Sequence, residues 1–185
     1  MINEIRQESE DRMKKAVEAL KKEYVTLRAG RATPALLDKV LVDYYGAMTP
    51  INQMAKISTP EPRLLTIEPW DKNVISDIER AILKSELGLT PNNDGNIIRI
   101  AIPQLTQERR TELVKVIKKK AEEARVAIRN IRRDANDQLK DFAKEGSISE
   151  DENKRGQEEI QKMTDKYIAD VDQLLDHKEK EIMEV

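Results

Sequence analysis

The sequence predicts an α+β protein of two domains, in which a small α/β domain is inserted into a long antiparallel three-helix bundle. All seven prolines lie between residues 32 and 104, and the flanking segments contain none. Proline breaks helices because it lacks the amide hydrogen and its ring clashes with the preceding turn. The flanks also carry apolar residues at intervals of three and four, which is typical of helices with one buried face. The chain is 37% charged but only 3% aromatic, which favours long, surface-rich helices.

The positions of the prolines predict the domain boundaries. We expect domain I at residues 1–30 and 105–185 and domain II at residues 31–104. The chain then crosses between the domains twice, at hinges near 30–33 and 103–106, which would let the two domains swing as rigid bodies. The residues expected to form these hinges are Gly30, Arg31, Pro103, Gln104 and Leu105.

The first predicted helix occupies most of residues 1–30. Gly30 is a plausible stop signal, and Arg28 suits the last turn because a cation there stabilises the helix dipole. The helix has one solvent-exposed face opposite an apolar stripe. The stripe consists of Ile2, Ile5, Met13, Val17, Leu20, Tyr24 and Leu27, with Ser9 in the one gap.

The second predicted helix begins after Thr106, a good N-terminal cap, and ends near Gly146. At about 1.5 Å per residue, some forty residues make a rod of roughly 60 Å. Lys120 and either Gln138 or Leu139 fill the remaining positions in the three-and-four spacing of its apolar stripe. The stripe itself is Leu113, Ile117, Ala124, Ile128, Ile131, Ala135 and Phe142.

The third predicted helix opens with a capping box formed by Ser149 and Glu152, just after a tight turn over residues 145–149. Three long helices with this spacing predict a left-handed bundle. The third stripe is Ile160, Met163, Tyr167, Val171, Leu174 and Ile182.

The insert has a mixed pattern. Strands are predicted over 39–45, 63–69 and 96–102, where β-branched and aromatic residues are enriched. The segment 44–50 reads as a strand that runs through a glycine turn. A helix is predicted over 73–88 with its stop at Gly88, and 90–96 is predicted to be a loop. The order of the strands does not follow from the sequence.

Signals for catalysis or metal binding are weak. The chain has no cysteine and one histidine, His177, which shares a helix face with Glu181. Such a pair without further ligands is far more often a solvated ion pair than a metal site. We see no nucleophile elbow or phosphate loop. We expect no signal peptide in the charged N-terminal segment, and no apolar run approaches a membrane span.

Arginines gather on the second predicted helix. Residues 109–133 hold ten Lys or Arg against three Glu, whereas 150–185 hold twelve acidic residues against six basic ones. Four of these arginines lie beside the apolar stripe and would form an exposed ridge. Arginine suits bidentate contacts to phosphate, and no aromatic platform for single-stranded bases accompanies it. The pattern favours a folded RNA as partner. The arginines are Arg125, Arg129, Arg132 and Arg133.

The same pattern has a purely structural interpretation. A basic helix beside an acidic one can pair across the bundle, and arginine stems can cover the edge of the core. The composition alone leaves these two interpretations about equally supported.

Four stretches of the sequence resemble the bacterial ribosome recycling factor family. They are "LRAGRATPALLD" (27–38), "VDYYGAMTPINQMA" (42–55), "LGLTPNNDGNIIRIAIPQLTQERR" (87–110) and "VAIRNIRRDAND" (126–137). The length and the "ISEDE" turn (148–152) agree, so the resemblance covers the whole chain.

The resemblance implies an L-shaped, non-enzymatic translation factor whose insert is a β/α/β sandwich-like domain. Such a factor binds the large ribosomal subunit after termination and contacts the 23S rRNA through its bundle. With elongation factor G, which hydrolyses GTP, it splits the ribosome into subunits for a new round of initiation. The matching RNA-binding positions are Arg129 and Arg132, with Arg133 and Arg125 as helpers. Helix geometry adds Arg6, which would lie about level with Arg132 if the first helix runs antiparallel to the second.

We therefore expect a cytoplasmic monomer that is not an enzyme and uses no cofactor, metal, membrane or small-molecule substrate. Two alternatives remain open. One is a helical protein-binding adaptor or holdase, whose binding would depend only weakly on salt. The other is a hydrolase with a carboxylate site around Asp71, Asp77 and Glu79.

Overall fold

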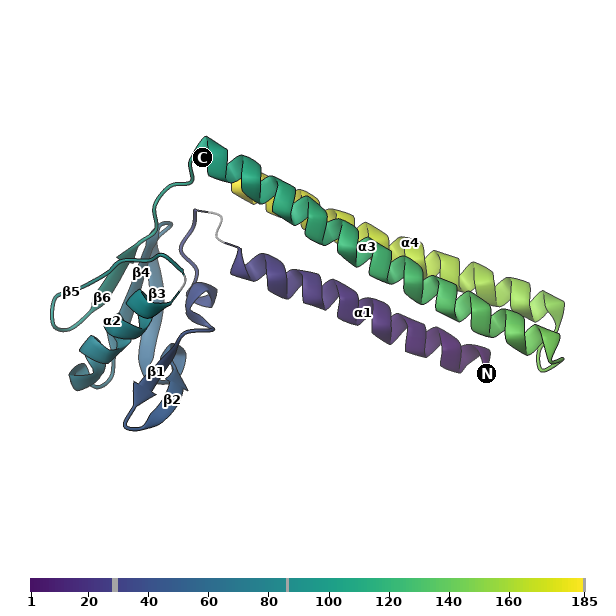
Figure 1. The fold of residues 1–185 in the computed structure, drawn as a ribbon, viewed down its shortest axis with the longest axis horizontal. Helices are drawn as coiled ribbons and strands as arrows, with labels where there is room; N and C mark the ends of the chain where they lie inside the picture. Colours follow the sequence, from purple (N-terminus) through teal and green to yellow (C-terminus); the bar gives the residue numbers. More distant parts are fainter. Residues whose placement is uncertain (28–29, 86, 185) are drawn as a thin grey trace. The chain divides into compact units, whose positions relative to one another are not determined.

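The protein folds into two compact units, and the computed structural model describes residues 1–27, 30–85 and 87–184 (Figure 1). Unit 1 comprises Met1–Tyr24 and Gln107–Val185, and unit 2 comprises Val25–Thr106. Unit 2 is therefore inserted into the sequence of unit 1. The α+β two-domain fold class predicted from the prolines and the helical flanks is confirmed.

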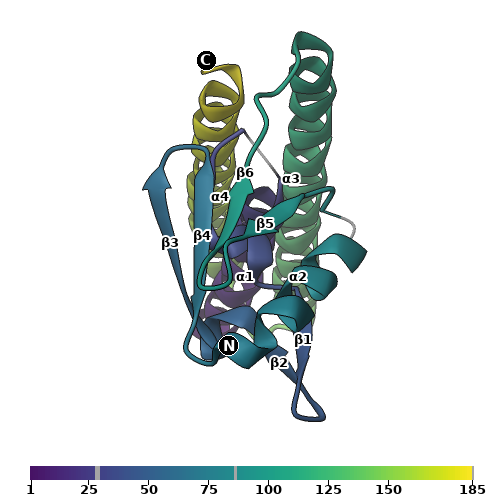
Figure 2. The same cartoon turned by 90° about the vertical axis from the view of Figure 1, so that its left-hand side faces the viewer.

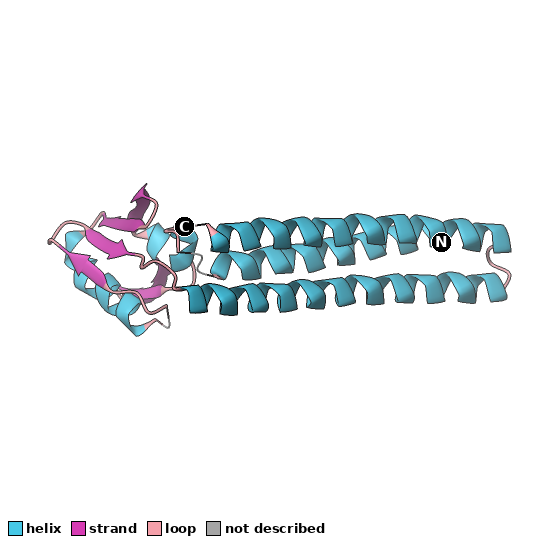
Figure 3. Ribbon diagram, turned by 90° about the horizontal axis from the view of Figure 1, so that it is seen from above, coloured by secondary structure: helices cyan, strands magenta, loops and turns pink. Residues whose placement is uncertain are grey.

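Within the described residues, unit 1 is a bundle of three long helices that lie side by side (Figures 1 and 3). Side-chain pairs fix their directions. Arg12 lies 3.2 Å from Asp134 and Lys120 lies 3.0 Å from Glu23, so the first helix runs antiparallel to the second. The chain then reverses into the third. These helices are α1 (Ile2–Thr26), α3 (Gln107–Lys144) and α4 (Glu150–Met183).

The turn between α3 and α4 uses two local signals in the sequence. Gly146 takes a φ of 76°, a left-handed conformation in which a side chain would be strained. The Ser149 hydroxyl accepts a hydrogen bond from the Glu152 amide at 3.0 Å, and the Glu152 carboxylate accepts one from the Ser149 amide at 3.3 Å. The predicted capping box is thus confirmed, and it satisfies amides that a helix start leaves unpaired.

The bundle core follows most of the predicted spacing, although Ile2, Leu27 and Leu174 of the predicted stripes are only partly buried. Ala121 is fully buried where the prediction used Lys120, and Leu139 is buried while Phe142 is only partly buried. Close packing marks this end of the bundle: a Cβ added to Gly156 would lie 3.1 Å from both δ carbons of Leu139. The small glycine therefore lets α3 and α4 approach closely, which stiffens their contact.

Unit 2 consists, in its described residues, of a β-hairpin, a larger antiparallel sheet and a short α-helix (Figure 2). Its connections include three short 3-10 helices: Pro34–Leu37, Ile51–Gln53 and Lys72–Val74. The sheet has the strand order β3-β4-β6-β5. Helix α2 buries Ile75, Ile78 and Ile82 in the core of this unit. The elements are β1 (Leu41–Tyr44), β2 (Ala47–Pro50), β3 (Ala55–Glu61), β4 (Leu64–Pro69), α2 (Ile75–Lys84), β5 (Pro91–Asn93) and β6 (Ile98–Ala101).

Three features of unit 2 differ from the prediction. Strand β3 was missed because it is an edge strand whose side chains are mostly exposed and which contains Pro60. Part of the predicted loop 90–96 forms the short strand β5. The predicted helix over 73–88 begins as α2 at Ile75 and ends at Lys84. Gly88 still takes a positive φ of 66°, but it lies in the connection to β5.

Candidate nucleic-acid interface

Four arginines follow one another along α3, and two of them, Arg125 and Arg132, contact α4. We call Arg125, Arg129, Arg132 and Arg133 the arginine ridge. Their surroundings change steadily along it, from a side chain that is held on several sides to one that is exposed. The structural and the functional interpretation of these residues can therefore be separated one residue at a time.

Arg125 is held most firmly. Its side chain is only 19% exposed, and its Nε and Nη2 atoms donate to one oxygen of Asp172 on α4 at 2.9 and 2.7 Å. Its Nη1 donates to Glu122 at 3.1 Å. Burial by itself would lower the pKa of Arg125, but Asp172 and Glu122 together raise it. Arg125 therefore braces α3 against α4 and has little surface left for an outside ligand.

Arg129 is more available. Its side chain is 40% exposed, and its Nη1 donates to the second oxygen of Glu122 at 3.2 Å. Among the described residues its Nε and Nη2 have no hydrogen-bond partner, so one edge of the guanidinium faces outward unpaired. Hydrogen bonds from Arg125 and Arg129 lower the pKa of Glu122, which keeps this carboxylate charged.

The last two residues of the ridge are the least restrained. Arg132 is partly buried and donates through Nη1 to the amide oxygen of Gln161 on α4 at 3.1 Å, a neutral partner. Arg133 is exposed, and in the described part of the chain no hydrogen bond or ion pair engages it. Pairing with the acidic helix α4 thus satisfies Arg125 and leaves much of the remaining charge open to solvent.

Arg6 does not lie where the sequence argument placed it. The pair between Arg12 and Asp134 puts Arg12, rather than Arg6, level with this part of α3. Six residues of helix separate Arg6 from Arg12, or about 9 Å along the axis. Arg6 instead donates to Glu159 of α4 at 3.4 Å, with both side chains about half exposed. The expected level position of Arg6 beside Arg132 is therefore wrong.

The two linkers of unit 2 are attached to the same turn of its sheet. The Ala32 amide donates to the Pro62 carbonyl at 2.7 Å, and the Ile102 amide donates to the Arg63 carbonyl at 2.8 Å. Ala32 and Ile102 are also buried in the core of unit 2. The chain is thus fixed to unit 2 from these two residues inward. Arg28, the residue expected in the last turn of the first helix, lies outside the described residues.

Comparison with known proteins identifies the family. The family model described as ribosome recycling factor matches residues 20–183. The chain belongs to the ribosome recycling factor family. This is a family of non-enzymatic translation factors, so the carboxylates of unit 2 need no catalytic role.

The relatives cover the whole chain. The ribosome-recycling factors of Heliobacterium modesticaldum and Carboxydothermus hydrogenoformans are 68% and 66% identical to it over the full length of both chains. A solution structure of a ribosome recycling factor is 47% identical, with a TM-score of 0.82 over 100% of this chain and 98% of that one. A T. thermophilus ribosome recycling factor, from models with E. coli elongation factor G bound to the E. coli post-termination complex, is 50% identical, with a TM-score of 0.68 over both whole chains.

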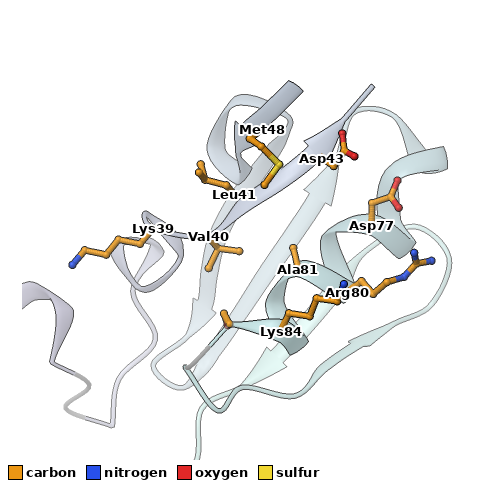
Figure 4. Close-up of a pocket in the computed structure, with 10 residues that line it drawn as sticks. Lys39, Val40, Leu41, Asp43, Met48, Asp77, Arg80, Ala81 and Lys84 are labelled. Carbon is orange, nitrogen blue, oxygen red and sulfur yellow. The ribbon is translucent and has the colours of Figure 1, made fainter. Parts of the chain in front are cut away.

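The carboxylates considered for a hydrolase do not converge on one site. Asp71 accepts hydrogen bonds from the Tyr45 hydroxyl at 2.6 Å and the Asn73 amide at 2.9 Å, and Glu79 accepts one from Asn93 at 2.7 Å. Asp77 lines a shallow groove of about 470 Å³ between α2 and the hairpin, near Asp43 (Figure 4). Asp71 and Glu79 are therefore used separately in the local structure of unit 2, whereas Asp77 borders the groove.

The described residues hold neither a metal-ligand cluster nor a membrane-spanning helix. No three His, Cys, Asp or Glu side chains there gather as a metal site. No helix in that part of the chain is long and apolar enough to cross a membrane.

The partners of the ridge do not follow from the apolar spacing or the charge counts of the sequence. Glu122 stands three and seven residues before Arg125 and Arg129, a spacing that places all three on one helix face and could have revealed the cluster. Asp172 and Gln161 come from α4, and their register against α3 gave no signal in the sequence.

Proposed function

We propose that this protein binds the post-termination ribosome through the 23S rRNA and splits it into subunits for a new round of initiation. Elongation factor G is the partner, and GTP hydrolysis by that partner supplies the energy. The protein acts in the cytoplasm as a monomer. The observation that carries the RNA contact is the outward guanidinium surface of Arg129, Arg132 and Arg133 on a helix already braced by Arg125.

Physical chemistry supports a folded RNA as the ligand of this surface. Guanidinium groups bind phosphate through charge-assisted, often bidentate hydrogen bonds. Structured RNA is recognised largely by its shape and backbone, which a straight ridge of cations on a rod can follow. Arg6 belongs to this proposal only as a separate contact, because it lies further along the bundle.

The same proposal assigns a mechanical role to the linkers. Domain I, residues 1–30 and 105–185, grips the RNA, while the partner GTPase pushes on domain II, residues 31–104. The hinges lie near 30–33 and 103–106. Buried Ala32 and Ile102 are anchored to one turn of unit 2, which supports bending outside them, at Gly30, Arg31 and residues 103–106. A tightly packed bundle would transmit the push, whereas a soft one would absorb it.

Light scattering of post-termination ribosomes tests the function directly. Mixing them with this protein, elongation factor G and GTP should lower the scattered intensity as subunits separate. Omission of GTP or of the partner should abolish the drop. An unchanged signal in the complete mixture would contradict the proposal and favour a protein-binding adaptor or holdase, whose ligands would be bound with weak salt dependence.

A further inference from the structure

The arginine ridge carries an acidic residue whose position is unusual for a nucleic-acid surface. Glu122 divides its carboxylate between two arginines: one oxygen lies 3.1 Å from Arg125 and the other 3.2 Å from Arg129. The Glu122 side chain is 55% exposed, so an approaching ligand meets it together with Arg129. The next residue, Glu123, is also exposed but has no hydrogen bond or ion pair within the described part of the chain.

We propose that Glu122 is a specificity-determining residue of the ridge. It acts as an internal counter-ion for Arg125 and Arg129, which weakens binding to RNA in general and thereby favours the ribosomal target. This inference rests on the proposed function, because it assumes that the ridge binds ribosomal RNA.

The competition follows from geometry. A phosphate that reaches Arg129 from its Nη1 side must displace the Glu122 carboxylate or lie beside it. Displacement costs the existing hydrogen bond, and proximity costs repulsion between like charges. A ligand that touches the ridge at one or two phosphates gains too little to offset this cost. A folded target that engages several arginines at once offsets this cost easily. The cost therefore increases the difference in affinity between the folded target and other RNA.

Glu122 also orders Arg129, the residue for which it competes with phosphate. By holding Nη1, it fixes the Arg129 side chain while the Nε and Nη2 edge stays unpaired. An arginine fixed in advance loses less conformational entropy when it binds. Removing Glu122 therefore has two opposing effects on the binding of a specific target. The target no longer competes with the carboxylate, but the Arg129 side chain is no longer held in place. Non-specific binding to RNA depends little on how Arg129 is held, so its affinity changes mainly because the competing carboxylate is gone.

The test compares Glu122→Gln with Glu123→Gln. Both changes remove one negative charge at adjacent exposed positions and preserve side-chain size, but only the first breaks the pairing with the ridge. The probe for general binding is a 16-base-pair RNA duplex of non-ribosomal sequence, and the probe for specific binding is the post-termination ribosome. Glu122→Gln should raise duplex affinity roughly three- to tenfold, as expected when Arg129 is freed from its ion pair and a neighbouring negative charge is removed. Glu123→Gln should raise it by no more than about twofold.

Ribosome affinity should change by no more than about twofold in Glu122→Gln, so the ratio of ribosome to duplex affinity falls. When Arg129→Ala is present, Glu122→Gln should raise duplex affinity no more than Glu123→Gln does, because Glu122 and Arg129 act through each other. Equal effects of the two Gln variants would overturn the proposal. An equal rise for duplex and ribosome, or a rise above that of Glu123→Gln that persists without Arg129, would do the same.

The proposed function has its own readout in this experiment. If Arg129→Ala with Arg132→Ala leaves ribosome affinity intact, the ridge does not bind the ribosome and the proposed function fails. If that pair weakens ribosome binding while Glu122→Gln behaves like Glu123→Gln, only the role of Glu122 fails.

Discussion

At the scale of single residues, four arginines within nine positions of α3 have four different surroundings. Arg125 is bound by two carboxylates and mostly covered, Arg129 shares one carboxylate, Arg132 meets a neutral amide, and Arg133 is exposed. The helix repeat predicts that all four border the apolar stripe, and the spacing of Glu122 on the same helix fits its pairs with Arg125 and Arg129. The contacts with Asp172 and Gln161 depend on the register between α3 and α4, which the repeat cannot predict.

Two buried tyrosines make the stability of the bundle depend on pH in the alkaline range. Tyr24 donates to the Ile117 carbonyl at 2.7 Å and Tyr167 donates to Glu10 at 3.1 Å. Burial raises the pKa of Tyr24 to about 12, and burial together with the Glu10 hydrogen bond raises that of Tyr167 to about 12. An unfolded tyrosine ionises near pH 10. Their contribution to stability is therefore complete below pH 10 and is lost as the pH rises from about 10 to 12.

Urea unfolding between pH 7 and pH 11.5 measures this effect. Tyr24→Phe should lose about 0.5–1.5 kcal/mol at pH 7 through the missing hydrogen bond. The variant with both Tyr24→Phe and Tyr167→Phe should lose less stability between pH 10 and 12 than the unaltered protein. An equally steep alkaline decline in both proteins would contradict the assignment of this decline to the two tyrosines.

At the scale of elements, the sequence predicts the long helices well and the small sheet poorly, for physical reasons. A helix of 38 residues repeats its three-and-four spacing many times, and Gly146 and the Ser149 capping box mark its junction with the next helix. Strand β5 has three residues, and β3 is an exposed edge with a proline, so neither shows the alternation that reveals a half-buried strand. Their pairing depends on contacts between distant segments.

The brace between α3 and α4 makes a prediction at this scale. Asp172→Asn removes the charged partner that binds two nitrogens of the mostly covered Arg125, and should lower the free energy of unfolding by about 1 kcal/mol. The matched control is Asp176→Asn, which removes a well-solvated pair with Lys180 on the same helix and should cost at most about 0.5 kcal/mol. Urea unfolding at low and high salt separates the two. Equal effects would mean that the Arg125 pair contributes no more than an ordinary surface pair.

At the scale of the whole molecule, the proposed function needs one unit that holds and another that moves. The bundle core is continuous along its length, and both linkers are anchored where they enter unit 2. Between these fixed parts lie Gly30, with a φ of 77°, and residues 103–106, which form no helix or strand. The proline pattern predicted a two-domain chain, whereas the anchoring bonds between Ala32, Ile102 and one turn could only come from the fold.

Replacing Gly30 and Arg31 with alanine tests the hinge. Alanine disfavours the positive φ of Gly30 and promotes helix, so the linker should stiffen. We expect the rate of ribosome splitting to fall more than ribosome affinity does. The control is Gly95→Ala, which places the same strain at a φ of 93° in a loop of unit 2 and should leave both quantities nearly unchanged. An equal fall of rate and affinity in the linker variant would count against a hinge.

The central claim is that the arginine ridge binds ribosomal RNA, and ribosome affinity measured across a salt series tests it most directly. The unaltered protein should lose affinity steeply as salt rises, because binding to phosphates releases counterions. The variant carrying Arg129→Ala and Arg132→Ala should bind more weakly, by about 1–3 kcal/mol for each bidentate arginine removed. Its salt slope should be shallower by about two, while circular dichroism shows an intact helical bundle. Unchanged affinity and an unchanged slope in a folded variant would contradict the account.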